Sequence, residues 1–123
     1  MTLGNIKETI EDKVIDYINS GASGRLIIFK PENSDKDLVV EKKGDYEKKV
    51  ICLKIFGKEF LGNDSIKKEI KPEENFYLLF VDFDIVKQDL KDNFVIVSSM
   101  DFSQNSIDKK DFSMFLIEKF EKK

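Results

Sequence analysis

The pattern of apolar and polar positions divides the chain into a helix, a series of strands and a second helix. Apolar residues three and four positions apart predict a helix over residues 5–20, and a similar stripe predicts a last helix over residues 109–121. Between these helices, short apolar runs bounded by glycine, proline and polar turns predict five strands. The predicted strands span residues 25–30, 37–41, 50–56, 76–83 and 94–98.

The connections between these strands are short or polar, and none has the composition of a linker. Residues 42–49 form a charged hairpin loop, and residues 57–75 are mostly loop with one helical turn near residues 66–70. Residues 84–93 form a connection that can hold another helical turn. The sequence therefore predicts a single α/β domain over residues 1–123, with a central mixed five-stranded sheet flanked by an N-terminal and a C-terminal helix.

The composition restricts the possible chemistry of the chain more than it restricts the possible folds. The chain has no histidine, which excludes Ser-His and Cys-His nucleophile pairs and imidazole metal ligands. Its one cysteine, Cys52, excludes an internal disulfide and a multi-cysteine zinc site, and favours a buried, inert thiol in a reducing cytoplasm. Any metal must be held by oxygen ligands, so Mg²⁺ or Mn²⁺ is expected if the chain is an active metalloenzyme.

Charge argues against strong nonspecific binding of nucleic acid. The chain has 21 basic and 24 acidic residues, and Arg25 is its single arginine. The hairpin tip, where Tyr46 lies among four lysines, is expected to be solvated. The alternative is a local basic patch on which a base stacks. The four lysines are Lys42, Lys43, Lys48 and Lys49.

No membrane partner is expected. The sequence contains no apolar run close to the roughly 18 residues that a bilayer-spanning helix needs. Its N-terminus does not carry a basic segment followed by an apolar one, so no secretory leader is expected either.

Candidate chemistry lies where an acid enters one predicted strand and a lysine lies on the next. Side chains alternate between the faces of a strand, so a hairpin through residues 42–49 can place Asp37 near Lys54. A carboxylate that binds a divalent cation beside an ammonium is the skeleton of a metal-dependent phosphodiesterase site. The alternative is structural, because an aspartate at a strand start is often a turn residue and a strand lysine often reaches solvent.

Two further sets of acids are weaker candidates. Glu11 falls inside the apolar arc of the first predicted helix, and a carboxylate there needs a partner. Lys7, one turn earlier, is the expected partner, and this helical ion pair is favoured over a role in a metal site. Asp82 and Asp84, at the end of the most apolar strand, are a secondary possibility for metal binding, with solvated strand ends as the simpler interpretation.

Taken in order, these segments resemble the PD-(D/E)xK nuclease superfamily. The resemblance rests on Glu-x-x-x-x-x-Tyr in the first helix (Glu11 to Tyr17), then Asp-Leu-Val-Val, a charged hairpin, Ile-Cys-Leu-Lys-Ile, and the later runs FYLLFVDF and DNFVIV. It implies a restriction-endonuclease-like fold. It also implies that Asp37 is the metal-binding acid, Lys54 the catalytic lysine and Glu11 the helix acid that some members use.

The sequence departs from the family pattern at Cys52, which stands two residues before Lys54 where a second acid belongs. A register shifted by two would instead put Lys54 in the acid position and Phe56 in the lysine position. Glu41 or Asp82 are alternative sources of the missing acid.

The resemblance implies a nuclease-like domain that binds nucleic acid, with impaired or atypical metal-dependent phosphodiesterase activity. Two alternatives stand beside it. One is a noncatalytic protein-interaction module, such as an immunity-type inhibitor or an accessory subunit with a protein partner. The other is an unrelated α/β fold in which the hairpin acids have no function.

Overall fold

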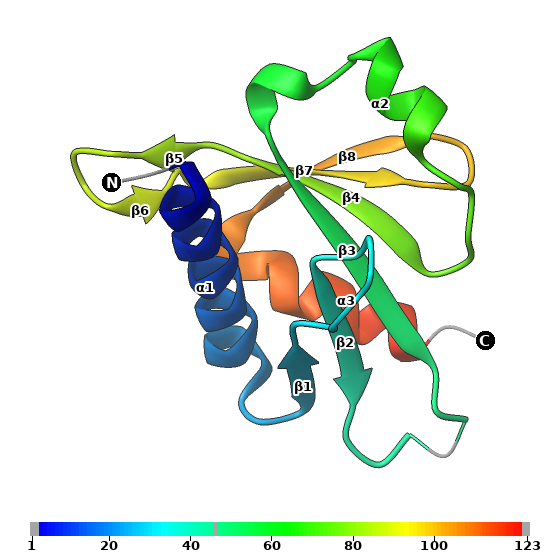
Figure 1. The fold of residues 1–123 in the computed structure, drawn as a ribbon. Helices are drawn as coiled ribbons and strands as arrows, with labels where there is room; N and C mark the ends of the chain where they lie inside the picture. The colour runs from blue at the N-terminus through cyan, green and yellow to red at the C-terminus, as the bar shows by residue number, and fades with distance from the viewer. Residues whose placement is uncertain (1–2, 46, 122–123) are drawn as a thin grey trace.

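The computed structural model describes residues 3–45 and 47–121, with side chains from Ile6 onward. Two helices, α1 and α3, pack on one face of a mixed sheet (Figure 1). The helices are α1 (Leu3–Ala22), α2 (Asp64–Glu69) and α3 (Phe112–Glu121), with single turns η1 (Lys58–Phe60) and η2 (Lys109–Asp111). The strands are β1 (Leu26–Phe29), β2 (Leu38–Lys42), β3 (Val50–Gly57), β4 (Phe76–Val81), β5 (Phe83–Asp84), β6 (Asp89–Leu90), β7 (Asn93–Ser98) and β8 (Gln104–Asp108).

Six of these strands form one sheet in the order β1-β2-β3-β4-β7-β8. The first three form an antiparallel meander, and the chain then crosses over through η1 and α2, so that β4 runs parallel to β3. Strands β7 and β8 continue the sheet in antiparallel pairing. Strands β5 and β6 form a separate two-stranded hairpin, which lies beside α1 (Figure 1).

The face of the sheet under α1 and α3, here called the inner face, carries the main core. Leu38 and Leu53 from the sheet pack with Ile18 of α1 and Leu116 of α3, and all four side chains are fully buried. Full burial of one such side chain contributes about 1.5–3 kcal/mol, so this layer is a large source of the fold's stability. The helices cross closely because Gly21 has no side chain: a Cβ there would overlap the Oγ of Ser113.

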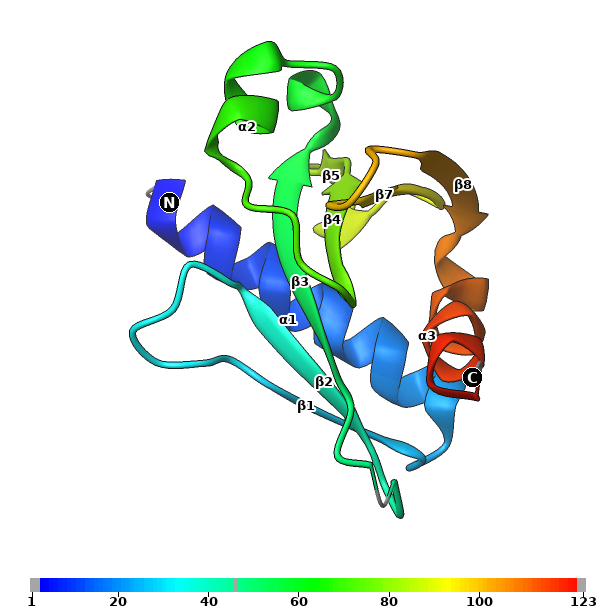
Figure 2. The same cartoon turned by 90° about the vertical axis from the view of Figure 1, so that its right-hand side faces the viewer.

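The opposite face, here called the outer face, is covered over only half its width. Over β4 and β7, Ile66 of α2 and Phe102 pack on a second cluster of apolar side chains, and Figure 2 shows α2 at this end. Over β1 and β3 the apolar side chains Ile27, Phe29 and Val50 are exposed. The two halves of the outer face therefore differ in what covers them.

The α/β class and the mixed sheet are confirmed, but three predictions about elements were wrong. The sheet has six strands rather than five, because β8 (Gln104–Asp108) is too polar to show a strand pattern. Residues 84–93 contain a β-hairpin and not a helical turn. The last helix begins at Phe112, after the short turn η2, and not at residue 109.

In the part of the chain that the structure describes, no helix combines the length and the hydropathy that crossing a bilayer would need.

Candidate functional site

Asp37 closes the end of the pairing between β2 and β3. Its N–H donates to the carbonyl of Leu53 (2.9 Å), and its Oδ2 accepts from the N–H of Ile55 (2.7 Å). Strand β3 continues past the start of β2, so the Asp37 carboxylate takes the place of a missing backbone acceptor. The Ile55 N–H would otherwise lack an acceptor, so the Asp37 side chain has a structural role.

Glu11 lies beside Asp37, under the start of β2. The Oδ1 of Asp37 is 3.2 Å from the Nζ of Lys7, and the Oε1 of Glu11 is 3.7 Å from the Nζ of Lys30. Both carboxylates are largely buried, with 13% of the Asp37 side chain and 14% of the Glu11 side chain exposed. Burial raises the pKa of Glu11 above its ordinary value, and the neighbouring charge of Asp37 raises it further, against the opposing charges of Lys30 and Lys7.

The structure thus brings two of the three predicted site residues together, with different lysines than expected. The predicted helical ion pair between Lys7 and Glu11 is replaced by two longer-range pairs, Lys7 with Asp37 and Lys30 with Glu11. Lys30 also donates to Asp12 (2.9 Å), so β1 and β2 are both tied by charge to α1. We call Lys7, Glu11, Lys30 and Asp37 the α1 charge cluster.

Lys54 lies on the other side of the sheet. Its neighbours Leu53 and Ile55 are buried in the inner core, whereas Cys52 and Phe56 pack on the outer cluster, so strand alternation puts Lys54 on the outer face. There the charge of Lys54 makes a small contribution to the lowered pKa of Asp35, whose main cause is a hydrogen bond from Lys36. The sheet therefore separates the Lys54 ammonium from the α1 charge cluster.

A second charged group crosses the outer face near Lys54. The Nζ of Lys36 is 2.9 Å from Asp35 Oδ1 and 3.4 Å from Glu73 Oε2, and it lies 4.4 Å from the centroid of the Phe76 ring. Only 10% of the Lys36 side chain is exposed. This lysine fastens the loop before β2 to the loop before β4, and its charge is neutralised by the two acids.

The donors present do not fit a divalent cation at Asp37 and Glu11. Mg²⁺ and Mn²⁺ take about six oxygen ligands, with carboxylates free to coordinate. Both oxygens of Asp37 already have partners, and Glu11 faces an ammonium. Across the described residues, no group of three His, Cys, Asp or Glu side chains is arranged to hold a metal ion.

The other acids considered as substitutes do not join the α1 charge cluster. Asp82 Oδ2 lies 3.9 Å from Lys58 Nζ, and Asp84 Oδ1 accepts from the N–H groups of Val86 and Lys87 at the tip of the β5–β6 hairpin. Glu41 is paired across from Val50, on the outer face with the other alternate residues of β2.

Cys52 is half-buried on the outer face. Burial raises the pKa of its thiol above its ordinary value, against the opposing effect of Lys36. The thiolate is therefore disfavoured at neutral pH, as expected of an unreactive cysteine.

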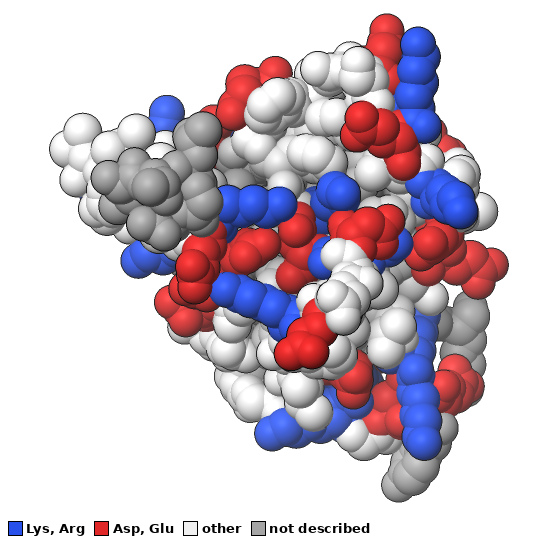
Figure 3. Space-filling view, in the orientation of Figure 1, with Lys and Arg blue, Asp and Glu red and all other residues white. Residues whose placement is uncertain are grey.

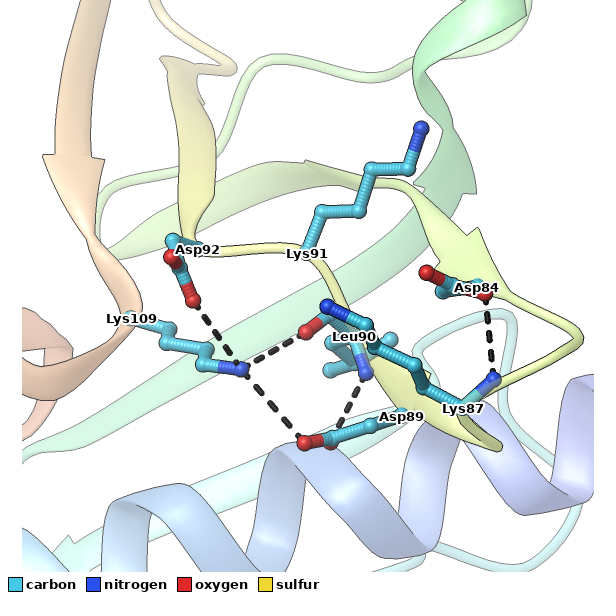
Figure 4. A pocket seen from close by; sticks show the side chains of 7 residues that line it. All are labelled: Asp84, Lys87, Asp89, Leu90, Lys91, Asp92 and Lys109. Atoms are coloured by element: carbon cyan, nitrogen blue, oxygen red, sulfur yellow. Dashed lines mark hydrogen bonds and ion pairs between the residues drawn. The ribbon is translucent and has the colours of Figure 1, made fainter.

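A hollow of about 500 Å³ lies at the base of the β5–β6 hairpin (Figure 4). Lys109 reaches into it and donates to the carbonyl of Leu90 (2.7 Å), with Asp89 and Asp92 within 3.5 Å of its Nζ. The hydroxyl of Tyr17 donates to both oxygens of Asp89 at 2.9 Å. We call Tyr17, Asp89, Asp92 and Lys109 the hairpin cluster.

Sequence reasoning missed this cluster, because its members are far apart in the chain and no local pattern joins them. Burial opposes ionisation of Asp89, but the bonds from Tyr17 and the Leu90 N–H, with the charge of Lys109, outweigh it and lower the pKa of Asp89. Every charged group of the cluster has a partner within it. The arrangement anchors the hairpin to α1 and leaves no unpaired group for chemistry.

Positive and negative side chains are interspersed on the face drawn in Figure 3, where no continuous basic patch is visible. At the hairpin between β2 and β3, Lys49 donates to the carbonyl of Lys119 (2.7 Å) and Lys42 lies 3.8 Å from Glu121. These lysines are thus tied to α3. Tyr46, proposed to stack a base, lies outside the described residues.

Comparisons with protein-family models, with curated proteins and with solved structures found no significant match for this chain.

Proposed function

We propose that this chain is a noncatalytic protein-interaction module. The observation that carries the proposal is a row of apolar side chains that runs along the outer face from its open edge to its covered half. Phe29, Val39, Cys52 and Phe76 are paired across β1, β2, β3 and β4 in that order. Phe29 is 42% exposed, Val39 and Cys52 are partly exposed, and Phe76 is buried beneath Lys36. An apolar row that reaches solvent at the open edge of a sheet face is a typical site of protein association.

The neighbouring residues extend this surface. Ile27, next to Phe29 on the same side of β1, and Val50 at the start of β3 are both about two-fifths exposed. Glu41 lies between them in the pairing register, so a polar residue borders the apolar row. An apolar centre with a polar rim is the usual anatomy of a protein interface.

The rival proposal, a metal-dependent phosphodiesterase, is supported only by the proximity of Glu11 and Asp37. It needs Lys54 on the same side of the sheet, and strand alternation argues against that. The bond from Ile55 to Asp37 gives the aspartate a structural purpose that needs no metal. The balance of contacts therefore favours binding over cleavage.

The restriction-endonuclease-like scaffold is part of the same proposal. Its support is the order of elements: a first helix, an antiparallel meander, a crossover through α2 and a strand parallel to β3. On this scaffold the acid and the lysine of the motif would have diverged into structural and surface roles.

The proposal can be tested by selecting from a random 12-residue peptide display library on the immobilised protein. We expect the wild-type chain to enrich a consensus sequence, the variant Phe29→Lys to lose it, and the matched variant Asn105→Lys on β8 to retain it. The same preparations should not cleave DNA or RNA with Mg²⁺ or Mn²⁺. Absence of any enriched consensus would refute the proposal. So would metal-dependent cleavage that disappears in both Asp37→Ala and Lys54→Ala.

A further inference from the structure

We infer that the free edge of β1 binds an extended segment of a partner protein by strand addition, with an acidic residue of that segment beside Arg25. This inference rests on the proposed function, because it names how the partner is held. Strand addition uses backbone hydrogen bonds for affinity and alternate side chains for specificity.

The backbone of β1 offers the necessary groups. The N–H of Lys43 donates to the carbonyl of Arg25 (3.0 Å), and these residues are opposite in the β1–β2 register. Hydrogen-bonded and non-hydrogen-bonded pairs alternate in an antiparallel ladder, so Ile27 and Phe29 bond to β2. The N–H and C=O groups of Leu26 and Ile28 point the other way, toward the open edge.

The side chains of β1 favour pairing. The strand reads Leu-Ile-Ile-Phe, with Ile27 and Phe29 exposed on the outer face. Edge strands that must stay unpaired commonly carry charged or polar residues or proline, and β1 has none of these between Leu26 and Phe29. The added strand would place its own apolar side chains beside Ile27 and Phe29 and extend the apolar row.

Two cations without acidic partners mark one end of the edge. In the described part of the chain, the guanidinium of Arg25 donates only to the carbonyl of Ala22 and the sulfur of Met114. Lys43, next to it across the register, is exposed and forms no ion pair there. A carboxylate at this end of the added strand would pair with both cations, and Arg25 can grip it through two N–H groups.

Charge also selects a partner protein over a second copy of this chain. Antiparallel pairing of two β1 edges about Ile28 would place Pro31 of one copy opposite Arg25 of the other, so a second copy would not supply an acid at that position. A partner segment with alternating apolar residues and an acidic end would supply it.

The test uses the peptides enriched on the wild-type protein, labelled for fluorescence anisotropy. Because the Ile28 N–H points to the open edge, Ile28→Pro removes the donor that a partner would use without breaking a β1–β2 hydrogen bond, and it also removes a side chain that packs against the inner core. We expect it to weaken binding at least tenfold. The matched substitution Ser106→Pro, at an outward-pointing position of the polar edge strand β8, should leave binding unchanged.

Two further measurements do not depend on how the proline is tolerated. Backbone N-methylation should abolish binding at the peptide positions whose N–H groups point toward β1. At the positions in between, whose N–H groups point away, it should leave binding intact. Replacing Arg25 by Gln should weaken binding threefold to tenfold, and the loss should vanish for a peptide whose acidic residue is changed to its amide. Lys110→Gln serves as the control for net charge.

Equal binding to wild type and Ile28→Pro, or N-methylation effects without alternation, would overturn strand addition. If those peptides still depended on Phe29, the proposed function would stand and the partner would lie on the outer face alone. Failure to select any peptide would instead count against the proposed function itself.

Discussion

The two edges of the sheet differ in composition, in exposure and in the charges beside them. Strand β1 presents Leu-Ile-Ile-Phe, whereas β8 presents Gln-Asn-Ser-Ile-Asp, whose first three residues are exposed and polar. Both are terminal strands with one row of unpaired backbone groups. Polar side chains discourage pairing along β8, and β1 lacks that protection.

The charge clusters beside the two edges differ in how fully their charges are neutralised. The hairpin cluster near β8 neutralises its charges internally, with Asp89 bound by Tyr17 and Lys109. The α1 charge cluster near β1 packs two acids together, and the pKa of Glu11 is raised as a result. The β8 side is therefore closed by its own contacts, while the β1 side retains an open edge and two acids close together.

The largest expected effect comes from breaking the layer that holds both edges. Leu53→Ala would leave a cavity in the fully buried inner core and cost about 3 kcal/mol of unfolding free energy. Because the edges share one core, urea unfolding followed by circular dichroism should remain one cooperative transition at a lower midpoint. Separate transitions would show that the two sides of the sheet unfold independently.

A smaller effect distinguishes one acid on each side of the sheet, Asp37 before β2 and Asp108 at the end of β8. Asp37→Ala would leave the Ile55 N–H without its acceptor and Lys7 without its partner, at a cost of about 1–3 kcal/mol. Asp108→Ala, which removes the acceptor for the Lys110 N–H, should cost about 1 kcal/mol. Amide hydrogen exchange should speed up at Ile55 only in the first variant.

If Asp37→Ala were instead as stable as the wild type, its carboxylate would not serve as the structural cap of β3. A metal role would then regain weight, and Mn²⁺ titration of the wild-type protein would be the measurement to make.

On the exposed edges, effects on stability should be small. Phe29→Ser removes a partly exposed ring and should cost about 1 kcal/mol or less, and Asn105→Ser should change stability by less than about 0.5 kcal/mol. Only the first variant should lose peptide binding. If both variants were folded and both lost peptide binding, the two edges would not differ in binding.

The smallest effect is on the pH dependence of stability, and it has opposite signs on the two sides. A raised folded-state pKa at Glu11 means that the folded chain binds more protons, so this residue's contribution to stability falls as pH rises from about 4.5. Asp89, with a lowered pKa, contributes stability above about 3.8 and loses it as pH falls through its folded-state value.

Relative to wild type, Glu11→Gln should therefore gain stability as pH rises above 4.5, while Asp89→Asn should lose stability as pH rises through the acid range. Urea midpoints measured from pH 2.5 to 7 would check both slopes. If the stability difference from wild type changed with pH in the same direction for both variants, the opposite pKa shifts of Glu11 and Asp89 would be contradicted.

The elements that sequence predicts well are those with a strong apolar period. The α1 stripe and the runs of β3 and β4 were recognisable because Val14, Leu53 and Leu79 face one common core. Strand β8 was missed because its register comes from pairing with β7, and its own residues are polar. Tertiary pairing overrode local propensity there.

The candidate site shows the same limit. The resemblance implied that Asp37 lies near Glu11 of the first helix, and the structure places the two acids side by side. Continuing the β2–β3 register by one pair puts Asp37 opposite Lys54, but β2 begins at Leu38 and not at the predicted residue 37. The Asp37 side chain therefore leaves the strand alternation and bonds to Ile55 and Lys7, while Lys54 keeps to the outer face. Lys30 became the partner of Glu11 through a contact between α1 and the end of β1 that no local spacing encodes.

Strand addition at β1 can be tested by amide hydrogen exchange of the protein with and without a selected peptide. We expect the N–H groups of Leu26 and Ile28 to become protected when the peptide binds, while the outward-pointing N–H groups of Gln104 and Ser106 exchange as before. Protection on β8, or binding that leaves Leu26 and Ile28 unprotected, would contradict it.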